Sequence, residues 1–140
     1  MLVRVIGGHG GVAPGFKATS YLIDGKLLID AGSVASGIHI NEQALVDHIL
    51  ISHPHLDHIK DLAFMCDNCF GLRPKAFKVY SSEDVKNAIC QHLMNDLIWP
   101  DFSKLPTPKN PTVTFEGLAP EKVLYLDDYE IMPVPVNHQG

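Results

Sequence analysis

Basic residues are scarce in this chain, and they do not cluster anywhere along it. The 140 residues include 11 Lys and Arg against 16 Asp and Glu, which gives a formal net charge of −5 at pH 7. A protein that binds a long nucleic acid through its phosphates carries a basic patch or stripe. The sequence therefore argues against a long nucleic acid as a partner, without excluding a small phosphate ester.

Cysteine is also scarce. The chain has three cysteines, an odd number that is too small for a disulfide framework. Cys66 and Cys69 form a C-x-x-C pair, but only Cys90 remains to complete a metal site, and no second pair follows. We interpret Cys66 and Cys69 as small residues near the end of a helix, and not as a zinc knuckle or a redox pair.

Long hydrophobic runs are absent. No stretch approaches the roughly 18 apolar residues that a bilayer-spanning helix needs. The N-terminal residues 1–6 run directly into glycines, without the apolar region or the small-residue cleavage site of a signal peptide. We therefore expect no contact with a membrane and a cytoplasmic location.

The chain does contain a dense group of side chains that bind metal ions. Three imidazoles and a carboxylate lie in the run His53-Pro54-His55-Leu56-Asp57-His58, directly after the apolar stretch at residues 48–52. Imidazole nitrogens and carboxylate oxygens are the ligands that zinc and similar divalent ions prefer. We interpret this run as a metal site.

The spacing of the run adds a geometric argument. If residues 49–52 form a buried strand, the run begins where the chain leaves the sheet. Pro54 keeps this piece extended, so that His53 and His55 share one face. Asp57 and His58 occupy adjacent positions at the start of a helix and point in different directions. The spacing thus predicts that one pair serves one metal ion and the other pair serves a second.

Two further polar residues are candidates for the same site. Asp30 follows the predicted strand at residues 26–29, where it can bond the far nitrogen of a metal-bound histidine or simply initiate a turn. His9 lies in the glycine-dense loop at residues 7–11, where it either faces the site or is exposed; the exposed position is favoured.

The residue pattern predicts strands that alternate with helices. We expect strands at residues 2–6, 19–23, 26–29, 49–52, 76–80, 123–126 and 129–136, and helices at 40–48, 57–69 and 81–98. Asp24-Gly25 predicts a hairpin with a type I′ turn, and the four prolines of residues 99–111 predict an irregular loop. Because hydrophobic residues make up 46% of the chain, a packed core is expected. The order predicts one α/β domain in which helices cover a mixed sheet.

The hairpin that ends in Leu28-Ile29-Asp30-Ala31-Gly32, the helix after it and the run from Ile49 to His58 together resemble the metallo-β-lactamase superfamily. Within it, the sequence is most similar to the class II cyclic-nucleotide phosphodiesterases. Their signature, His-x-His-Leu-Asp-His followed by an aliphatic residue, is matched here through Ile59. The sequence departs from that signature at Asp61, where the family prefers a small residue, and at Met65-Cys66.

The resemblance implies an αββα sandwich of which this chain forms the first half. Residues 1–140 are then a single metallo-hydrolase domain, truncated before the last metal-ligand motifs. The implied cofactors are two divalent metal ions, with zinc expected and manganese or iron as alternatives. His53, His55 and His138 would hold one ion, and Asp57 and His58 the other.

The implied activity is the hydrolysis of 3′,5′-cyclic nucleotides such as cAMP to 5′-monophosphates through a metal-bound hydroxide. The implied partner is therefore a small-molecule phosphodiester substrate. Asp57 would be the catalytic residue, since it holds the second metal and orients the nucleophile, and Asp30 would fix the tautomer of a ligating histidine.

Two alternatives to this activity stay open. The first is another hydrolase on the same scaffold, acting on a thioester, a lactone, a lactam or an RNA phosphodiester. Leu56, where many RNA-processing members carry Gly, argues against tRNA maturation. The second is a catalytically incomplete fragment that binds only metal or a partner. A homodimer is left open as well.

Overall fold

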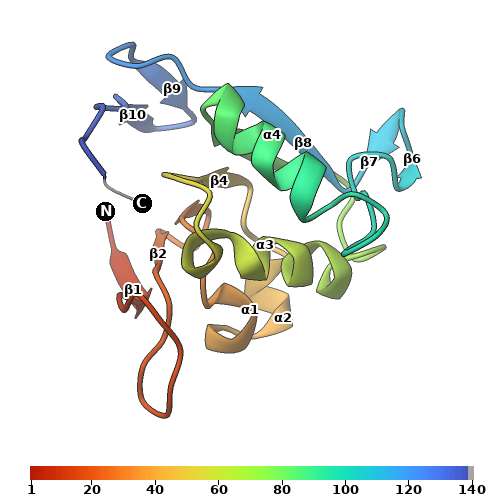
Figure 1. Ribbon diagram of the computed structural model, residues 1–140, viewed down its shortest axis with the longest axis horizontal. Coiled ribbons are helices and arrows are strands. Elements are labelled where there is room, and N and C mark those ends of the chain that lie inside the picture. The colour runs from red at the N-terminus through yellow and green to blue at the C-terminus, as the bar shows by residue number, and fades with distance from the viewer. Residues whose placement is uncertain (139–140) are drawn as a thin grey trace.

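A six-stranded mixed sheet is the centre of the structure, a computed structural model that describes residues 1–138 (Figure 1). The strand order is β1-β2-β3-β4-β5-β8, with β1 (Val3–Gly7), β2 (Ser20–Ile23), β3 (Leu27–Ile29), β4 (His48–Leu50), β5 (Phe77–Ser81) and β8 (Val113–Gly117). Four helices connect them: α1 (Val34–Gly37), α2 (Ile40–Gln43), α3 (Leu56–Asn68) and α4 (Glu83–His92). Two separate two-stranded sheets are β6 (Pro106–Thr107) with β7 (Asn110–Pro111), and β9 (Leu124–Leu126) with β10 (Tyr129–Ile131).

The sheet changes direction at β3. Strands β1, β2 and β3 pair antiparallel, whereas β3, β4, β5 and β8 pair parallel. The turn between β2 and β3 has positive φ at both Asp24 (49°) and Gly25 (71°), which confirms the predicted type I′ geometry. The parallel strands β3, β4 and β5 all end at one edge of the sheet, and the segments that leave this edge carry Asp30, the histidine run and α3.

The main core lies between the sheet and the helices. Side chains alternate along each strand, so Leu28, Ile49 and Val79, on three neighbouring strands, all point to the helical face and are fully buried. Helix α3 packs on them through one face that includes Leu62 and Met65. This arrangement confirms the predicted α/β layering.

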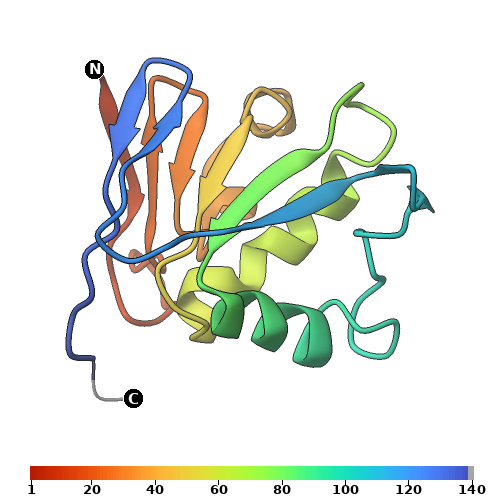
Figure 2. The same cartoon turned by 90° about the horizontal axis from the view of Figure 1, so that it is seen from above.

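The opposite face of the sheet carries a smaller apolar cluster. Leu27, Leu50 and Tyr80 point to this face, and Leu126 from the β9–β10 hairpin covers them. Figure 2 shows the chain leaving β8 at one edge of the sheet and crossing to this hairpin, which lies on the side of β1, β2 and β3. Helices thus cover one face of the six-stranded sheet, and the β9–β10 hairpin covers part of the other face.

Several predicted boundaries were wrong. The predicted helix at residues 40–48 ends at Gln43, and His48 instead begins β4, because its N–H bonds to the Lys26 carbonyl and it pairs with β3. Helix α4 ends at His92 instead of residue 98. In the loop that follows, the Asn95 side chain accepts hydrogen bonds from two backbone N–H groups. Strand β10 ends at Ile131 instead of residue 136.

Three elements were not predicted. Helix α1 is a single short turn, and the β6–β7 hairpin lies inside the proline-rich loop. Strand β8 is the outermost strand of the sheet and pairs parallel with β5. Short elements of this kind leave little periodicity in a sequence. No helix among residues 1–138 is both long and apolar enough to cross a membrane.

We expect Leu28→Ala to lower the free energy of unfolding by about 2–5 kcal/mol, because the truncation leaves a cavity in the core between β3 and the helices. Urea denaturation followed by far-UV circular dichroism measures this change. The matched control is Leu45→Ala, at a side chain that is 65% exposed. Equal unfolding midpoints for the two variants would contradict the assignment of the core.

Candidate metal centre

The histidine run lies in the connection between β4 and α3. His53 and His55 precede the helix, which begins at Leu56, and Asp57 and His58 lie in its first turn. The residue before the helix, His55, is extended, with φ −65° and ψ 146°, as expected for the N-cap position of a helix. The sequence thus places the run at the edge of the sheet, as predicted from the strand before it.

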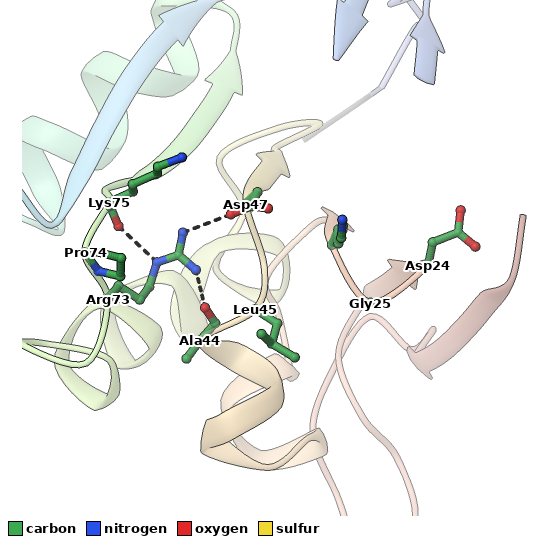
Figure 3. A pocket seen from close by; sticks show the side chains of 9 residues that line it. Asp24, Gly25, Ala44, Leu45, Asp47, Arg73, Pro74 and Lys75 are labelled. Atoms are coloured by element: carbon green, nitrogen blue, oxygen red, sulfur yellow. Dashed lines mark hydrogen bonds and ion pairs between the residues drawn. The ribbon is translucent and has the colours of Figure 1, made fainter. Parts of the chain in front are cut away.

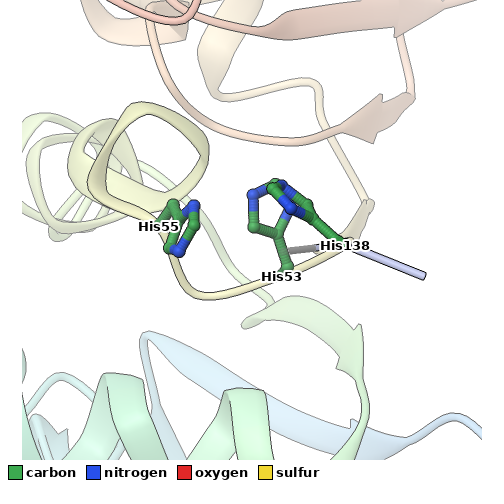
Figure 4. Close-up of side chains that lie close together, drawn as sticks. All are labelled: His53, His55 and His138. Carbon is green, nitrogen blue, oxygen red and sulfur yellow. The ribbon is translucent and has the colours of Figure 1, made fainter. Parts of the chain in front are cut away.

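Three imidazoles come together at this edge (Figure 4). One ring nitrogen from each of His53, His55 and His138 lies within 4.8 Å of the others. The ring centroid of His138 is 4.4 Å from that of His53 and 5.2 Å from that of His55. The structure thus brings a residue near the C-terminal end against the run in the middle of the chain. Three imidazole nitrogens are a donor set that fits zinc.

The ring of His53 is held in the form that binds metal. Burial, followed by the charge that three neighbouring histidines carry when protonated, lowers the pKa of His53 below its ordinary value. A lowered pKa keeps the ring neutral at pH 7, and neutral imidazole is the metal ligand.

Asp57 and His58 lie beside this cluster. The ring centroids of His58 and His53 are 4.0 Å apart, and Asp57 Oδ2 is 3.4 Å from His58 Nε2. Both side chains are partly buried. The two residues thus present a carboxylate oxygen and a ring nitrogen to the same small region, next to the three-histidine cluster.

A buried carboxylate orients two of these rings. Asp30 Oδ2 lies 2.7 Å from His58 Nδ1, and Asp30 also accepts hydrogen bonds from the backbone N–H (2.8 Å) and the hydroxyl (2.8 and 3.0 Å) of Ser52. A carboxylate only accepts, so His58 Nδ1 carries a proton, and the lone pair of a neutral ring is on Nε2, which lies 3.4 Å from Asp57 Oδ2. Asp30 also has a positive φ of 57°, and its role beside a metal-bound histidine stays a prediction.

Ser52 extends the same network to His53, a contact that the sequence reasoning missed. Its Oγ lies 3.0 Å from His53 Nδ1. Because the hydroxyl donates to Asp30, it accepts from His53, which leaves His53 Nε2 with its lone pair. No local pattern marks Ser52, because a serine before a loop is common.

The backbone around the site is tightly packed. A β-carbon on Gly32 would lie 1.8 Å from the Asp57 carbonyl oxygen, so only glycine fits where the end of β3 meets the first turn of α3. Ala31 bonds this turn through its N–H to the His58 carbonyl at 2.7 Å. Asp61, the departure from the family signature, is buried and accepts a hydrogen bond from the N–H of Ala35 in α1.

Other candidates lie outside the cluster. His9 is exposed, packs its ring edge on Phe16 at 4.6 Å and contacts the backbone of Lys17. Cys66 and Cys69 are buried in the core without a disulfide, and burial raises the pKa of both thiols, as expected for packing residues.

A hollow of about 300 Å³ lies at the other end of the strands (Figure 3). Three basic residues, Lys26, Arg73 and Lys75, line it. Arg73 donates to the carbonyls of Ala44 and Lys75, faces Asp47 at 3.4 Å, and stacks on the ring of Phe77. These contacts occupy the guanidinium group of Arg73, which is therefore held by the protein itself.

The sequence profile of the class II cAMP phosphodiesterases matches residues 19–135. The 3′,5′-cyclic-nucleotide phosphodiesterase 1 of Saccharomyces cerevisiae is 27% identical over 99 residues, which are 69% of this chain and 26% of that protein.

Two solved structures share the fold. Unliganded yeast PDE1 has a TM-score of 0.75 at 14% identity, over 93% of this chain and 54% of that chain. The metallo-β-lactamase fold protein YhfI from Bacillus subtilis has a TM-score of 0.64 at 22% identity, over 93% of this chain and 50% of that chain. The chain therefore has part of the metallo-β-lactamase fold and spans about half of each of these structures. From the profile match, the chain belongs to the class II cAMP phosphodiesterase family.

Proposed function

We propose that this chain is part of a metal-dependent phosphodiesterase that hydrolyses 3′,5′-cyclic nucleotides, cAMP among them, to 5′-monophosphates. The observation that carries the proposal is the convergence of His53, His55 and His138 in a chain of this family. The cytoplasmic location and the homodimer stay predictions.

The ligands in this proposal divide into two sets. One divalent ion, which we expect to be zinc, is held by His53, His55 and His138. A second ion is bound in part by Asp57 and His58. Bound divalent ions act as Lewis acids on a phosphoryl oxygen and lower the pKa of water. Asp57 and His58 provide two donor atoms, fewer than the four of tetrahedral zinc, so we expect the second ion to bind more weakly than the first.

The remaining residues orient the histidine rings and the attacking water. Asp30 accepts from His58 Nδ1 directly and from Ser52, which accepts from His53 Nδ1. Both Nε2 atoms are thereby left as metal donors, and the rings are fixed before any ion arrives. The Asp57 carboxylate, partly exposed beside them, is the group that we propose orients the attacking water.

We expect His55→Ala to abolish tight zinc binding and phosphodiesterase activity, because it removes one of three donor nitrogens. The loss should exceed the roughly 10–100-fold that removal of a partner of a ligating histidine causes. Zinc binding is measured by isothermal titration, and turnover by hydrolysis of bis-p-nitrophenyl phosphate and release of 5′-AMP from cAMP. The matched control is His92→Ala, an exposed residue of α4.

The two measurements separate the parts of this proposal. Zinc binding and turnover in His55→Ala equal to those of the unchanged chain would exclude the histidine cluster as the metal site. Zinc binding without turnover in the unchanged chain would leave the metal site standing and exclude the activity of this chain.

We expect Asp30→Asn to weaken zinc binding about 10–100-fold, because the amide removes the charge that holds both rings in one tautomer. Asparagine tolerates the positive φ of this position, so the turn is retained. Asp96→Asn is the matched control, since Asp96 also has a positive φ (62°) and is exposed. Unchanged zinc affinity in Asp30→Asn, measured by competition with a chelator, would argue against the orienting role.

A further inference from the structure

The third histidine of the cluster reaches it from the β9–β10 hairpin. After β10 ends at Ile131, the N–H of Glu121 bonds to the Pro133 carbonyl at 2.8 Å and closes the hairpin. Residues 134–138 are exposed. Where His138 lies is therefore set largely by where the hairpin is anchored.

Apolar contact is one of two means by which the hairpin is anchored to the sheet. Leu126 is 6% exposed and packs with Leu27, Leu50 and Tyr80. Leu124, Tyr129 and Ile131 of the hairpin pack against the same cluster and are partly buried, so apolar contacts and polar contacts anchor the hairpin together.

The polar anchor is a buried histidine of the central sheet. His48, the first residue of β4, is 6% exposed, and its Nδ1 lies 3.2 Å from the hydroxyl of Tyr80. Its Nε2 lies 3.1 Å from Asp127 Oδ2, in the turn between β9 and β10. Because the carboxylate can only accept, Nε2–H donates to Asp127 and, in the neutral ring, Nδ1 accepts from Tyr80.

The hairpin thus supplies the hydrogen-bond partner of the second nitrogen in the buried His48 ring. An imidazole on an apolar sheet face costs free energy unless its nitrogens are hydrogen-bonded, and Asp127 is the group that satisfies Nε2. Tyr129, on the other side of the turn, donates to Asp24 Oδ2 at 2.9 Å. Docking of the hairpin and pairing of His48 Nε2 are therefore coupled.

We propose that His48 and Asp127 are positioning residues for the metal centre: they dock the β9–β10 hairpin on the sheet and so deliver His138 to His53 and His55. The inference rests on the proposed metal site and adds how that site is completed. A ligand on an exposed segment binds with an affinity reduced by the fraction of time that it is away from the site. By linkage, a bound metal ion protects the docked hairpin in return.

The test uses Asp127→Gly in the full chain. Glycine fits the positive φ of Asp127 (50°) without strain, so this change removes the side-chain contact and leaves the turn geometry accessible. The matched control is Asp128→Gly, the same substitution one residue along, at an exposed carboxylate with no hydrogen bond or ion pair among residues 1–138. Asp127→Asn keeps an acceptor and is the rescue variant.

Three readouts are compared: Co²⁺ affinity, the visible spectrum of bound Co²⁺, and hydrogen exchange of the amides of residues 124–131 with and without metal. In Asp127→Gly we expect several-fold weaker Co²⁺ binding, a spectrum shifted towards that of His138→Ala, and faster exchange in the hairpin. Asp128→Gly and Asp127→Asn should match the unchanged chain, in which metal slows exchange in the hairpin. A purely structural role for Asp127 would not change the Co²⁺ spectrum.

The outcomes separate this inference from the proposed function. If the unchanged chain binds Co²⁺ and His138→Ala weakens it, but Asp127→Gly has the affinity and spectrum of the unchanged chain, the positioning role is wrong and the metal site stands. If His55→Ala weakens binding but His138→Ala does not, His138 is no ligand and the inference is overturned. If the unchanged chain binds no Co²⁺, the proposed metal site and this inference fail together.

Discussion

The buried carboxylate of Asp30 is the contact on which the arrangement of the site depends. It lies just beyond β3 and bonds to Ser52, which follows β4, and to His58 in the first turn of α3. Three segments of the main fold therefore meet at one charged group. Burying a carboxylate costs free energy unless its oxygens accept hydrogen bonds, so the fold stabilises Asp30 only when these segments are correctly placed.

The same constraint explains why the histidine run lies where it does. Parallel strands β3 and β4 end at one edge of the sheet, and the close approach of Gly32 to the Asp57 backbone leaves no room between that edge and α3. The run is held against the sheet by its backbone as well as by its side chains. Rings that are oriented in advance lose less entropy when they bind an ion.

Much of the fold follows from local pattern, and several details do not. The Asp24-Gly25 turn, α3 and the strand before the histidine run follow from short-range periodicity and turn chemistry. The helix predicted through His48 was wrong, because pairing with β3 takes that residue into the sheet. Strand β8 carries no strong alternation, and its place beside β5 is a long-range pairing.

The sequence by itself determined the chemistry of the candidate ligands, the spacing of the run at His53 to His58, and the layered α/β architecture. These depend on side-chain type and on neighbours a few positions apart. Only the tertiary structure decided how Asp30 bonds to one ring directly and to another through Ser52, and how His138 returns to the run from a hairpin bonded to His48. The reason is physical: His48 and Asp127 are 79 positions apart, and no local period records which distant side chains packing will bring together.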